Sequence, residues 1–361
     1  MSSQIGKTLK VSVFGESHGK GIGAVIDGFP AGEAIDMEEL LQFMARRRPG
    51  RDKTSTARKE DDLPEILSGI KDGVTCGTPI AAVIRNTDQR SKDYKNISHE
   101  ARPGHADFTG YERYHGFNDI RGGGHFSGRL TAPLVFAGGL CRQYLARRGI
   151  YVGAHLESIA GIRDHAFDPC ETSEGRILAP ENKAFPVIDD MAGEAMREAI
   201  EAARLDGDSV GGVVEIMALG MPAGIGSPMF DTVEGRLALG LYGIPAVKGV
   251  SFGNGFEAAA IRGSENNDAF YMDGEHVRTE TNHHGGALGG ITSGMPVIAH
   301  VAFKPTPSIA KRQKTIDYVE RKDAEIQVQG RHDPCVVIRA VPVVEAVTSI
   351  ILMDLLLGES N

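Results

Sequence analysis

Four glycine-rich turns hold most of the side chains in this sequence that could do chemistry. They span residues 15–19, 102–107, 121–129 and 330–335; the last three combine histidine with arginine, and the first places His18 after Ser17. Arginine can hold a phosphate or carboxylate with two parallel donors, glycine lets backbone amides approach a ligand, and histidine exchanges a proton near neutral pH. Any one turn is equally consistent with a solvated surface turn. Together they predict a site for a ligand with several negative charges.

A basic stretch at residues 46–59 could also bind anions. It contains seven basic residues, one acid (Asp52) and no aromatic residue. The chain as a whole has 39 Lys and Arg against 48 Asp and Glu, a formal charge of −9. Because RNA binding favours a basic surface with aromatic residues that stack on bases, we interpret the stretch as a mobile loop that clamps a small anion. We expect no nucleic-acid partner, and an anion- or RNA-binding module is the non-enzymatic alternative.

Two other patterns resemble ligand sites, but we interpret both as ordinary loops. Gly253, Gly255 and Ala258 imitate a dinucleotide fingerprint after a strand, yet 262–264 interrupts the stretch before a helix could form. His283 and His284 are adjacent in a loop, and no Cys or carboxylate stands nearby at ligand spacing. We therefore expect neither a Rossmann unit nor a metal.

The elements that position the turns follow from the apolar periodicity. A helix is predicted from Asp36, which with Glu39 forms a capping signal, to the arginines before Pro49. Further helices are predicted at 130–148, 190–205, 228–242 and 343–357, and the clearest strands at 9–14, 22–26, 79–84, 213–218, 247–252, 297–303 and 336–341. No regular βαβ period or convincing linker is present, and 164–186 is interpreted as a surface excursion. The pattern predicts one large α+β domain over 1–361.

The sequence also suggests the cellular compartment of the protein. The first nine residues lack the apolar core of a signal peptide, and Asp354 interrupts the apolar run at 350–357. The four cysteines form no C-x-x-C pair, which argues against a disulfide framework or a structural zinc site. We expect a cytoplasmic protein without a membrane partner.

Six motifs in this order resemble the chorismate synthase family over nearly the whole chain. They are Gly15-Glu16-Ser17-His18-Gly19, the three arginines before Pro49, Asn86-Thr87-Asp88-Gln89-Arg90-Ser91, Arg102-Pro103-Gly104-His105-Ala106-Asp107, Lys304-Pro305-Thr306 and Gly330-Arg331-His332-Asp333-Pro334-Cys335. The resemblance implies a layered α+β sandwich of mainly antiparallel sheets with helices packed on the outside, assembled as a homotetramer. It also implies a lyase that uses reduced FMN to eliminate phosphate from 5-enolpyruvylshikimate 3-phosphate, giving chorismate. NADPH is then a candidate indirect reductant and an external flavin reductase a candidate partner.

The resemblance assigns roles to particular residues. The catalytic residues would be His18 as general acid towards the leaving phosphate, His105 as the group that governs flavin protonation, and Asp333 as a base. The substrate would contact Ser17, Arg47, Arg48, Arg129 and Arg331. The flavin would contact Arg102, His125, Ser127, Ala246, Gly289, Lys304, Thr306, Ser308 and Arg331.

Three positions depart from the pattern of the family. The family often has Arg-Ser-Ser-Ala-Arg after the three glycines, so that His125 here replaces an arginine contact; Pro245 replaces a frequent Asn and Lys53 a frequent Arg. Lys53 keeps the charge but loses the planar fork. An NAD(P)H-dependent flavin oxidoreductase is the enzymatic alternative.

Overall fold

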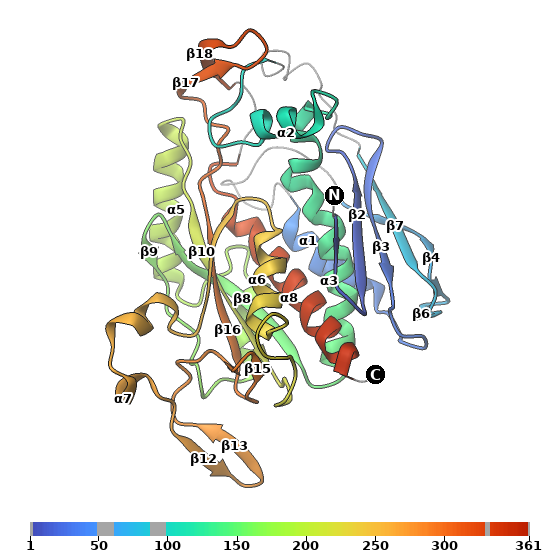
Figure 1. The fold of residues 1–361 in the computed structure, drawn as a ribbon, viewed down its shortest axis with the longest axis vertical. Coiled ribbons are helices and arrows are strands. Elements are labelled where there is room, and N and C mark those ends of the chain that lie inside the picture. Colours follow the sequence, from blue (N-terminus) through green and yellow to red (C-terminus); the bar gives the residue numbers. More distant parts are fainter. Residues whose placement is uncertain (1–2, 49–60, 87–98, 329–332, 360–361) are drawn as a thin grey trace.

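Two five-stranded antiparallel sheets form the outer layers of the fold (Figure 1). The computed structural model describes residues 3–48, 61–86, 99–328 and 333–359. The first sheet has the order β1 (Gln4–Ile5), β2 (Lys10–Gly15), β3 (Gly21–Asp27), β7 (Ile80–Arg85) and β4 (Pro64–Ser68). The second has the order β11 (Val247–Phe252), β16 (Val297–Phe303), β10 (Gly212–Leu219), β8 (Tyr151–Ile159) and β9 (Ile162–Arg163). The predicted α+β class with mainly antiparallel sheets is confirmed.

The central helices lie between the sheets, which corrects the expectation that helices pack on the outside. α3 (Thr131–Ala146) contacts β2, β3 and β7 of the first sheet, and α8 (Val337–Glu359) contacts β8 and β10 of the second. Both helices are apolar around their circumference, so they must bury every face. α5 (Asp190–Leu205) has one apolar stripe and packs outside, on β8 and β9.

The remaining helices also follow sequence signals. The Asp36 side chain accepts hydrogen bonds from the amides of Glu38 and Glu39, which fixes the start of α1 (Met37–Arg47) as predicted. α6 (Val233–Tyr242) begins later than expected because Thr232 caps it. Shorter helical segments within the described ranges are α2 (Asp107–Tyr114), α4 (Glu174–Leu178), α7 (Gly263–Asn266) and the 3₁₀ segments Arg121–Phe126, Gly128–Leu130, Ala179–Asn182 and Gly255–Ala260.

The strand predicted at 336–341 is wrong, because these residues open α8. A run of valines and isoleucine suits a buried strand and a buried helix equally well, and packing against α3 decides for the helix. The approach is close, since a β-carbon on Gly138 of α3 would lie 2.3 Å from Ala346 of α8. Among the described residues only α8 is long and apolar enough to cross a membrane, and 89% of that window is buried inside the fold.

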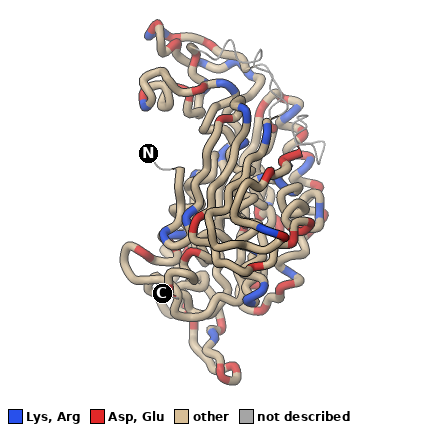
Figure 2. Tube along the Cα trace, turned by 90° about the vertical axis from the view of Figure 1, so that its right-hand side faces the viewer, with Lys and Arg blue, Asp and Glu red and all other residues tan. Residues whose placement is uncertain are grey.

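In the part of the chain that the structure describes, four two-stranded hairpins extend from this framework. They pair β5 (Ile70–Lys71) with β6 (Val74–Thr75), β12 (Phe270–Asp273) with β13 (His276–Thr279), β14 (Ala287–Leu288) with β15 (Ile291–Thr292), and β17 (Arg312–Asp317) with β18 (Lys322–Gln327). Figure 1 shows the β12–β13 hairpin projecting at one end of the molecule and the β17–β18 hairpin at the other. In the described part of the chain, acidic and basic residues are interspersed along the trace (Figure 2).

Candidate active site

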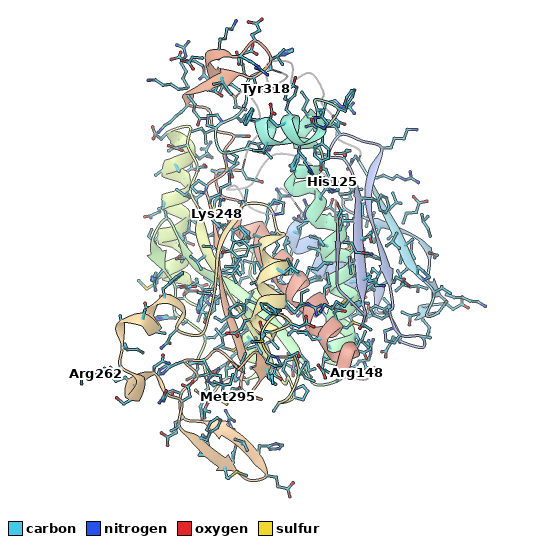
Figure 3. The ribbon with its side chains drawn as sticks, viewed as in Figure 1. His125, Arg148, Lys248, Arg262, Met295 and Tyr318 are labelled. Carbon is cyan, nitrogen blue, oxygen red and sulfur yellow. The ribbon has the colours of Figure 1, made fainter. Side chains whose placement is uncertain are left out.

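A cavity of about 860 Å³ lies where the ends of the central elements meet. Its walls come from the end of α1, the 121–129 turn, the segment entering β11, the segment leaving β16 and the start of α8. Figure 3 marks two of these walls, at His125 and Lys248. The cavity brings together eleven of the residues predicted above: Arg47, Arg102, His105, His125, Ser127, Arg129, Ala246, Lys304, Thr306, Ser308 and Asp333.

The triple glycine at 122–124 separates the two predicted catalytic histidines. All three glycines have positive φ, between +53° and +86°. A β-carbon on Gly122 would lie 2.1 Å from the His18 ring, and one on Gly123 would lie 3.3 Å from Nε2 of His105. Gly122 lines the cavity, so His18 lies directly behind the wall that Gly122 forms. Ser17 is buried beside it, and its Oγ has no hydrogen-bond partner among the described residues.

Two residues of the same turn, the acidic Asp107 and the basic Arg102, hold the His105 side chain in place. Its Nδ1 lies 2.7 Å from Oδ1 of Asp107, and Arg102 donates to both carboxylate oxygens of Asp107 at 2.7 and 2.8 Å. The remaining nitrogen of the Arg102 guanidinium, Nη1, donates a hydrogen bond to Ser308 Oγ at 3.1 Å. Burial alone would raise the pKa of Asp107, but hydrogen bonds from Arg102 and His105 hold it well below its usual value. Asp107 is therefore an anion at neutral pH and orients the imidazole.

Two buried arginines share one carboxylate that the sequence did not reveal. Asp62, 3% exposed, accepts from Arg47 Nη1 at 2.5 Å and also from Arg129 Nη1. Burial, together with the nearby charges of Arg339 and Arg129, lowers the pKa of Arg47 to about 10, so it stays protonated at neutral pH. One negative charge against two positive charges leaves this wall cationic, which suits an anionic ligand.

Another part of the lining carries two lysines and an unsatisfied hydroxyl. Lys304 donates to the carbonyl of Gly104, and burial together with the charge of Lys248 lowers its pKa. Thr306 Oγ1 is buried without a hydrogen-bond partner among the described residues. A buried polar atom of this kind usually meets water or a ligand.

Asp333 forms the third charged part of the cavity. Its Oδ2 lies 2.6 Å from Nη1 of Arg339, whose Nε donates to the backbone carbonyl of Arg47 at 3.0 Å. The start of α8 is thereby tied to the end of α1. Arg339 and Lys248 both line the cavity, although neither was predicted as a site residue.

Comparison with known proteins places this site in a family. The sequence model described as chorismate synthase matches residues 9–357. The chain belongs to the chorismate synthase family. It is 49% identical to the chorismate synthase of Pyrococcus abyssi over 354 residues, 98% of this chain and 97% of that protein. It is 46% identical to that of Korarchaeum cryptofilum over 353 residues, 97% of this chain and 96% of that protein. A crystal structure of chorismate synthase matches the fold with a TM-score of 0.76 at 30% identity, covering 98% of this chain and 93% of that one.

Membership makes the protein a lyase of aromatic biosynthesis, in the shikimate pathway, and implies that it needs a reduced flavin. The cavity fits such a group. Its volume lies within the roughly 300–1,000 Å³ typical of small-molecule sites, its walls carry several cations, and the Thr306 hydroxyl is free to accept or donate. A flavin nucleotide combines a planar ring with anionic phosphate, which is the chemistry these walls complement.

Two family-implied contacts have a different role in this structure. Arg102 uses its guanidinium on Asp107, Ser308 and His105, so it positions His105 instead of offering a free fork to a phosphate. His125 lines the cavity, but its Nδ1 lies 2.9 Å from the carbonyl of Gly15 and its Nε2 lies 2.8 Å from Ser3 Oγ. Its ring therefore faces the cavity with both nitrogens already used.

Four predicted positions do not line the cavity. Gly289 lies in the turn between β14 and β15, where a β-carbon would meet no atom within 4 Å, and the cavity walls do not include it. His18 and Ser17 lie behind Gly122, as described above. Arg48 ends α1, half-buried, and its Nε has no hydrogen-bond partner among the described residues. Arg331 and residues 49–59 of the predicted basic loop lie outside the described residues.

Asp62 and Asn86 are two further positioning residues that sequence reasoning missed. Asn86 accepts from Arg129 Nε at 3.1 Å and donates to the carbonyls of Glu16 and Gly19 at 3.0 and 2.9 Å. It thus connects the first turn to the third. Asn86 stands in a motif that the resemblance had picked out, whereas Asp62 follows Asp61 in a polar stretch that gave no signal.

Proposed function

We propose that this chain binds reduced FMN and 5-enolpyruvylshikimate 3-phosphate together in the cavity and forms chorismate by 1,4-elimination. The observation that carries the proposal is the convergence of Arg47, Arg129, His105, Thr306 and Asp333, which come from distant parts of the sequence, on one cationic cavity. The phosphate leaves from one carbon and a hydrogen from another, so a C–O and a C–H bond break. When bound, the reduced flavin supplies the electron and hydrogen chemistry that no side chain provides.

The residues of the chain bind, orient and exchange protons. Arg47 and Arg129 face the substrate phosphate or carboxylate, with Arg48 and Arg331 as further anchors; charge-assisted bonds of this kind are the strongest available here. His18, supported by Ser17, lies behind Gly122, which has no side chain to block it, and from there it would give a proton to the leaving phosphate. His105, oriented by Asp107, controls protonation of the cofactor, and Asp333 accepts a proton beside Arg339.

The flavin would be held by Lys304, Thr306, Ser308, Ala246 and Ser127, which line one part of the cavity. Lys304 supplies charge and Thr306 its unsatisfied hydroxyl. Ala246 adopts a φ of +74°, and its carbonyl accepts from the amide of Lys304 at 3.0 Å, so the two predicted flavin segments are joined. The contact predicted for Gly289 would need a hairpin from a neighbouring subunit, because Gly289 is absent from this cavity.

The assembly and surroundings belong to the same proposal. We expect a cytoplasmic homotetramer that receives electrons from an external flavin reductase or indirectly from NADPH. Large exposed apolar side chains support association, among them Phe230 at 96%, Phe256 at 91% and Phe270 at 64% exposure. Light scattering of the purified protein tests the tetramer, and a monomer at micromolar concentration would contradict it.

An anaerobic reaction tests the activity. Protein, FMN, dithionite and substrate should release phosphate and chorismate in equal amounts without lasting oxidation of the flavin. Phosphate release at the same rate without reduced flavin would refute the cofactor assignment. Sustained NAD(P)H consumption without elimination would favour an oxidoreductase instead.

A further inference from the structure

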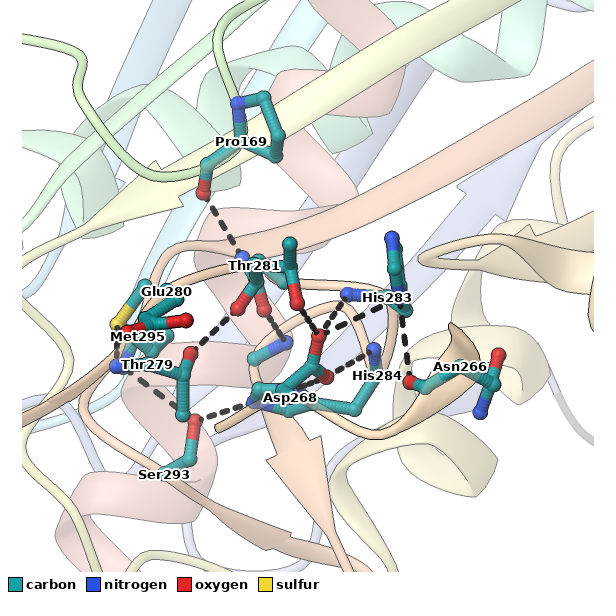
Figure 4. A network of polar contacts seen from close by, with 12 residues as sticks. Pro169, Asn266, Asp268, Thr279, Glu280, Thr281, His283, His284, Ser293 and Met295 are labelled. Atoms are coloured by element: carbon teal, nitrogen blue, oxygen red, sulfur yellow. Dashed lines mark hydrogen bonds and ion pairs between the residues drawn. The ribbon is translucent and has the colours of Figure 1, made fainter. Parts of the chain in front are cut away.

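A second cluster of polar side chains lies outside the cavity, in the turns that surround the β14–β15 hairpin (Figure 4). It is formed by Asp268, which precedes β12, by Thr281, His283 and His284, and by Ser293, which follows β15. Figure 3 marks Met295, two residues after Ser293, far along the molecule from His125. The proposed lyase reaction uses none of these residues.

Three of these side chains form a relay with a defined direction. His284 Nε2 lies 2.9 Å from Ser293 Oγ, and His284 Nδ1 is hydrogen-bonded to Oδ2 of Asp268. A carboxylate can only accept, so the proton of the neutral imidazole belongs on Nδ1. Nε2 then carries the lone pair, and the Ser293 hydroxyl must donate to it. A serine activated by an imidazole that is itself oriented by a carboxylate is the arrangement of a nucleophile with its general base.

Asp268 is built to remain an anion. Besides His284, it accepts from Thr281 Oγ1 at 2.6 Å and from the backbone amides of His283 and His284 at 2.8 and 3.0 Å. Burial would raise the pKa of Asp268, but these hydrogen bonds lower it to about 2. The same bonds fix the backbone that carries His284, so the imidazole and its carboxylate move as one unit.

Solvent reaches the serine but not the groups behind it. Ser293 is half-buried and is followed by the exposed Gly294, which has no side chain to cover the hydroxyl. The side chains of His284 and Asp268 are only 7% and 5% exposed. Glu234, in the first turn of α6, is a second acid near His284. Burial raises the pKa of Glu234, and the charge on His284 has a smaller, lowering effect. Both acids would stabilise a protonated His284.

We propose that Ser293, His284 and Asp268 form a second, nucleophilic site that takes small carboxylic esters. The Ser293 oxygen attacks the ester carbonyl while its proton passes to His284 Nε2. The bond to the alcohol then breaks and His284 returns the proton to the departing oxygen, leaving an acylated serine. Water, deprotonated by His284, hydrolyses the acyl serine and restores the site.

The experiment treats the full-length protein with a fluorophosphonate probe and, separately, with p-nitrophenyl acetate. We expect mass spectrometry to locate the phosphonyl adduct on Ser293 and the ester to be hydrolysed above the buffer rate. His284→Ala should slow both reactions by about 10²–10⁴-fold, the usual contribution of a general base. Ser293→Ala should abolish the adduct at that peptide.

The matched control is His283→Ala. The Nδ1 atom of His283 lies 3.1 Å from the carbonyl of Asn266 and 3.6 Å from Oδ1 of Asp268, the carboxylate oxygen that does not bond to His284, so labelling should stay near the wild-type rate. Absence of an adduct on Ser293 in the folded wild type, or ester hydrolysis in Ser293→Ala at the wild-type rate, would overturn the proposal. Lyase activity should persist in Ser293→Ala, which shows that the variant folds and separates this site from the proposed function.

Discussion

Gly122 and His18 are so close that no side chain fits between them. A β-carbon on Gly122 would lie 2.1 Å from both Cε1 and Nδ1 of His18, and the residue has a φ of +61°. Position 122 needs glycine because glycine readily adopts positive φ and because a side chain there would overlap the His18 ring. The backbone of the 121–129 turn therefore sets the position of the imidazole behind the cavity wall.

Replacement of this glycine should impair catalysis. Gly122→Ala must displace His18, because the clash involves a ring that is itself 5% exposed. We expect turnover to fall by at least about 10-fold and the free energy of unfolding to fall by about 1–3 kcal/mol. Steady-state rates and urea denaturation measure the two effects. Gly175→Ala, where the added methyl meets no atom within 4 Å, is the control and should match the wild type.

His105 should matter for turnover more than for flavin binding. His105→Ala removes a general acid–base group, and such groups contribute about 10²–10⁴-fold. Its fixed contact is with Asp107, so flavin affinity measured by fluorescence titration should change little. His276→Ala on the exposed strand β13 is the control. Wild-type turnover in His105→Ala would remove His105 from the mechanism.

Asp62 should be essential for stability and for substrate affinity. Asp62→Asn leaves the buried guanidiniums of Arg47 and Arg129 without their shared carboxylate. Removing one partner of a buried ion pair typically costs about 3–5 kcal/mol, and KM should rise as the two arginines reorient. Asp61→Asn changes the exposed neighbour and should alter neither quantity. Equal stability of the two variants would show that Asp62 does not organise this wall.

Thr306 offers a test that separates ligand binding from stability. Its Oγ1 makes no hydrogen bond to the described protein, so Thr306→Val should leave the free energy of unfolding unchanged or slightly higher. Flavin affinity should nevertheless fall by about 5–10-fold if the hydroxyl bonds to the cofactor. Thr348→Val in α8 is a close control, because Thr348 Oγ1 is also buried without a partner among the described residues but lies outside the cavity. Identical flavin affinity in both variants would exclude the Thr306 contact.

His155 should make the stability of the second sheet depend on pH. The residue is fully buried between Asp164 and Glu215, at 3.2 and 2.6 Å. Burial alone would lower its pKa, but hydrogen bonds to Asp164 and Glu215 raise it from 6.5 to about 9. The pKa of His155 is higher in the folded than in the unfolded protein. Its contribution to the free energy of unfolding is therefore complete below pH 6.5 and disappears as the pH rises through 9.

The size of this effect can be measured by urea denaturation at several pH values. The shift corresponds to about 3 kcal/mol of stability lost between pH 6.5 and 9. His155→Gln should flatten that part of the profile, whereas His165→Gln, at a side chain that is 77% exposed, should retain it. A profile with the same slope in His155→Gln would assign the pH dependence to other groups.

Local signals in the sequence predicted the elements better than their arrangement. The cap at Asp36 and the single apolar stripe of α5 each identify a helix correctly, because both depend on neighbouring residues. The segment that opens α8 was misread as a strand, since valine and isoleucine fit either buried element. The position of α3 and α8 between the sheets depends on long-range packing, which the periodicity does not encode.

In the site, too, the sequence revealed the residues that stand in distinctive motifs but not those that depend on long-range contacts. His105 and Asp333 stand in motifs with distinctive residue types and both line the cavity. Asp62 acts through Arg129, and Arg339 through the backbone carbonyl of Arg47; both partners are distant in sequence, so no local pattern pointed to these residues. The use of Arg102 on Asp107 could not be predicted either, because a motif gives the residue type and not which of its donors are already occupied.

The most direct test of this account is the structure of the protein with oxidised FMN and 5-enolpyruvylshikimate 3-phosphate, a pair that should not turn over. We expect both molecules in the 860 Å³ cavity, with the flavin beside Thr306 and the substrate anions against Arg47 and Arg129. Density for either molecule at another place on the chain, with this cavity left to solvent, would contradict it.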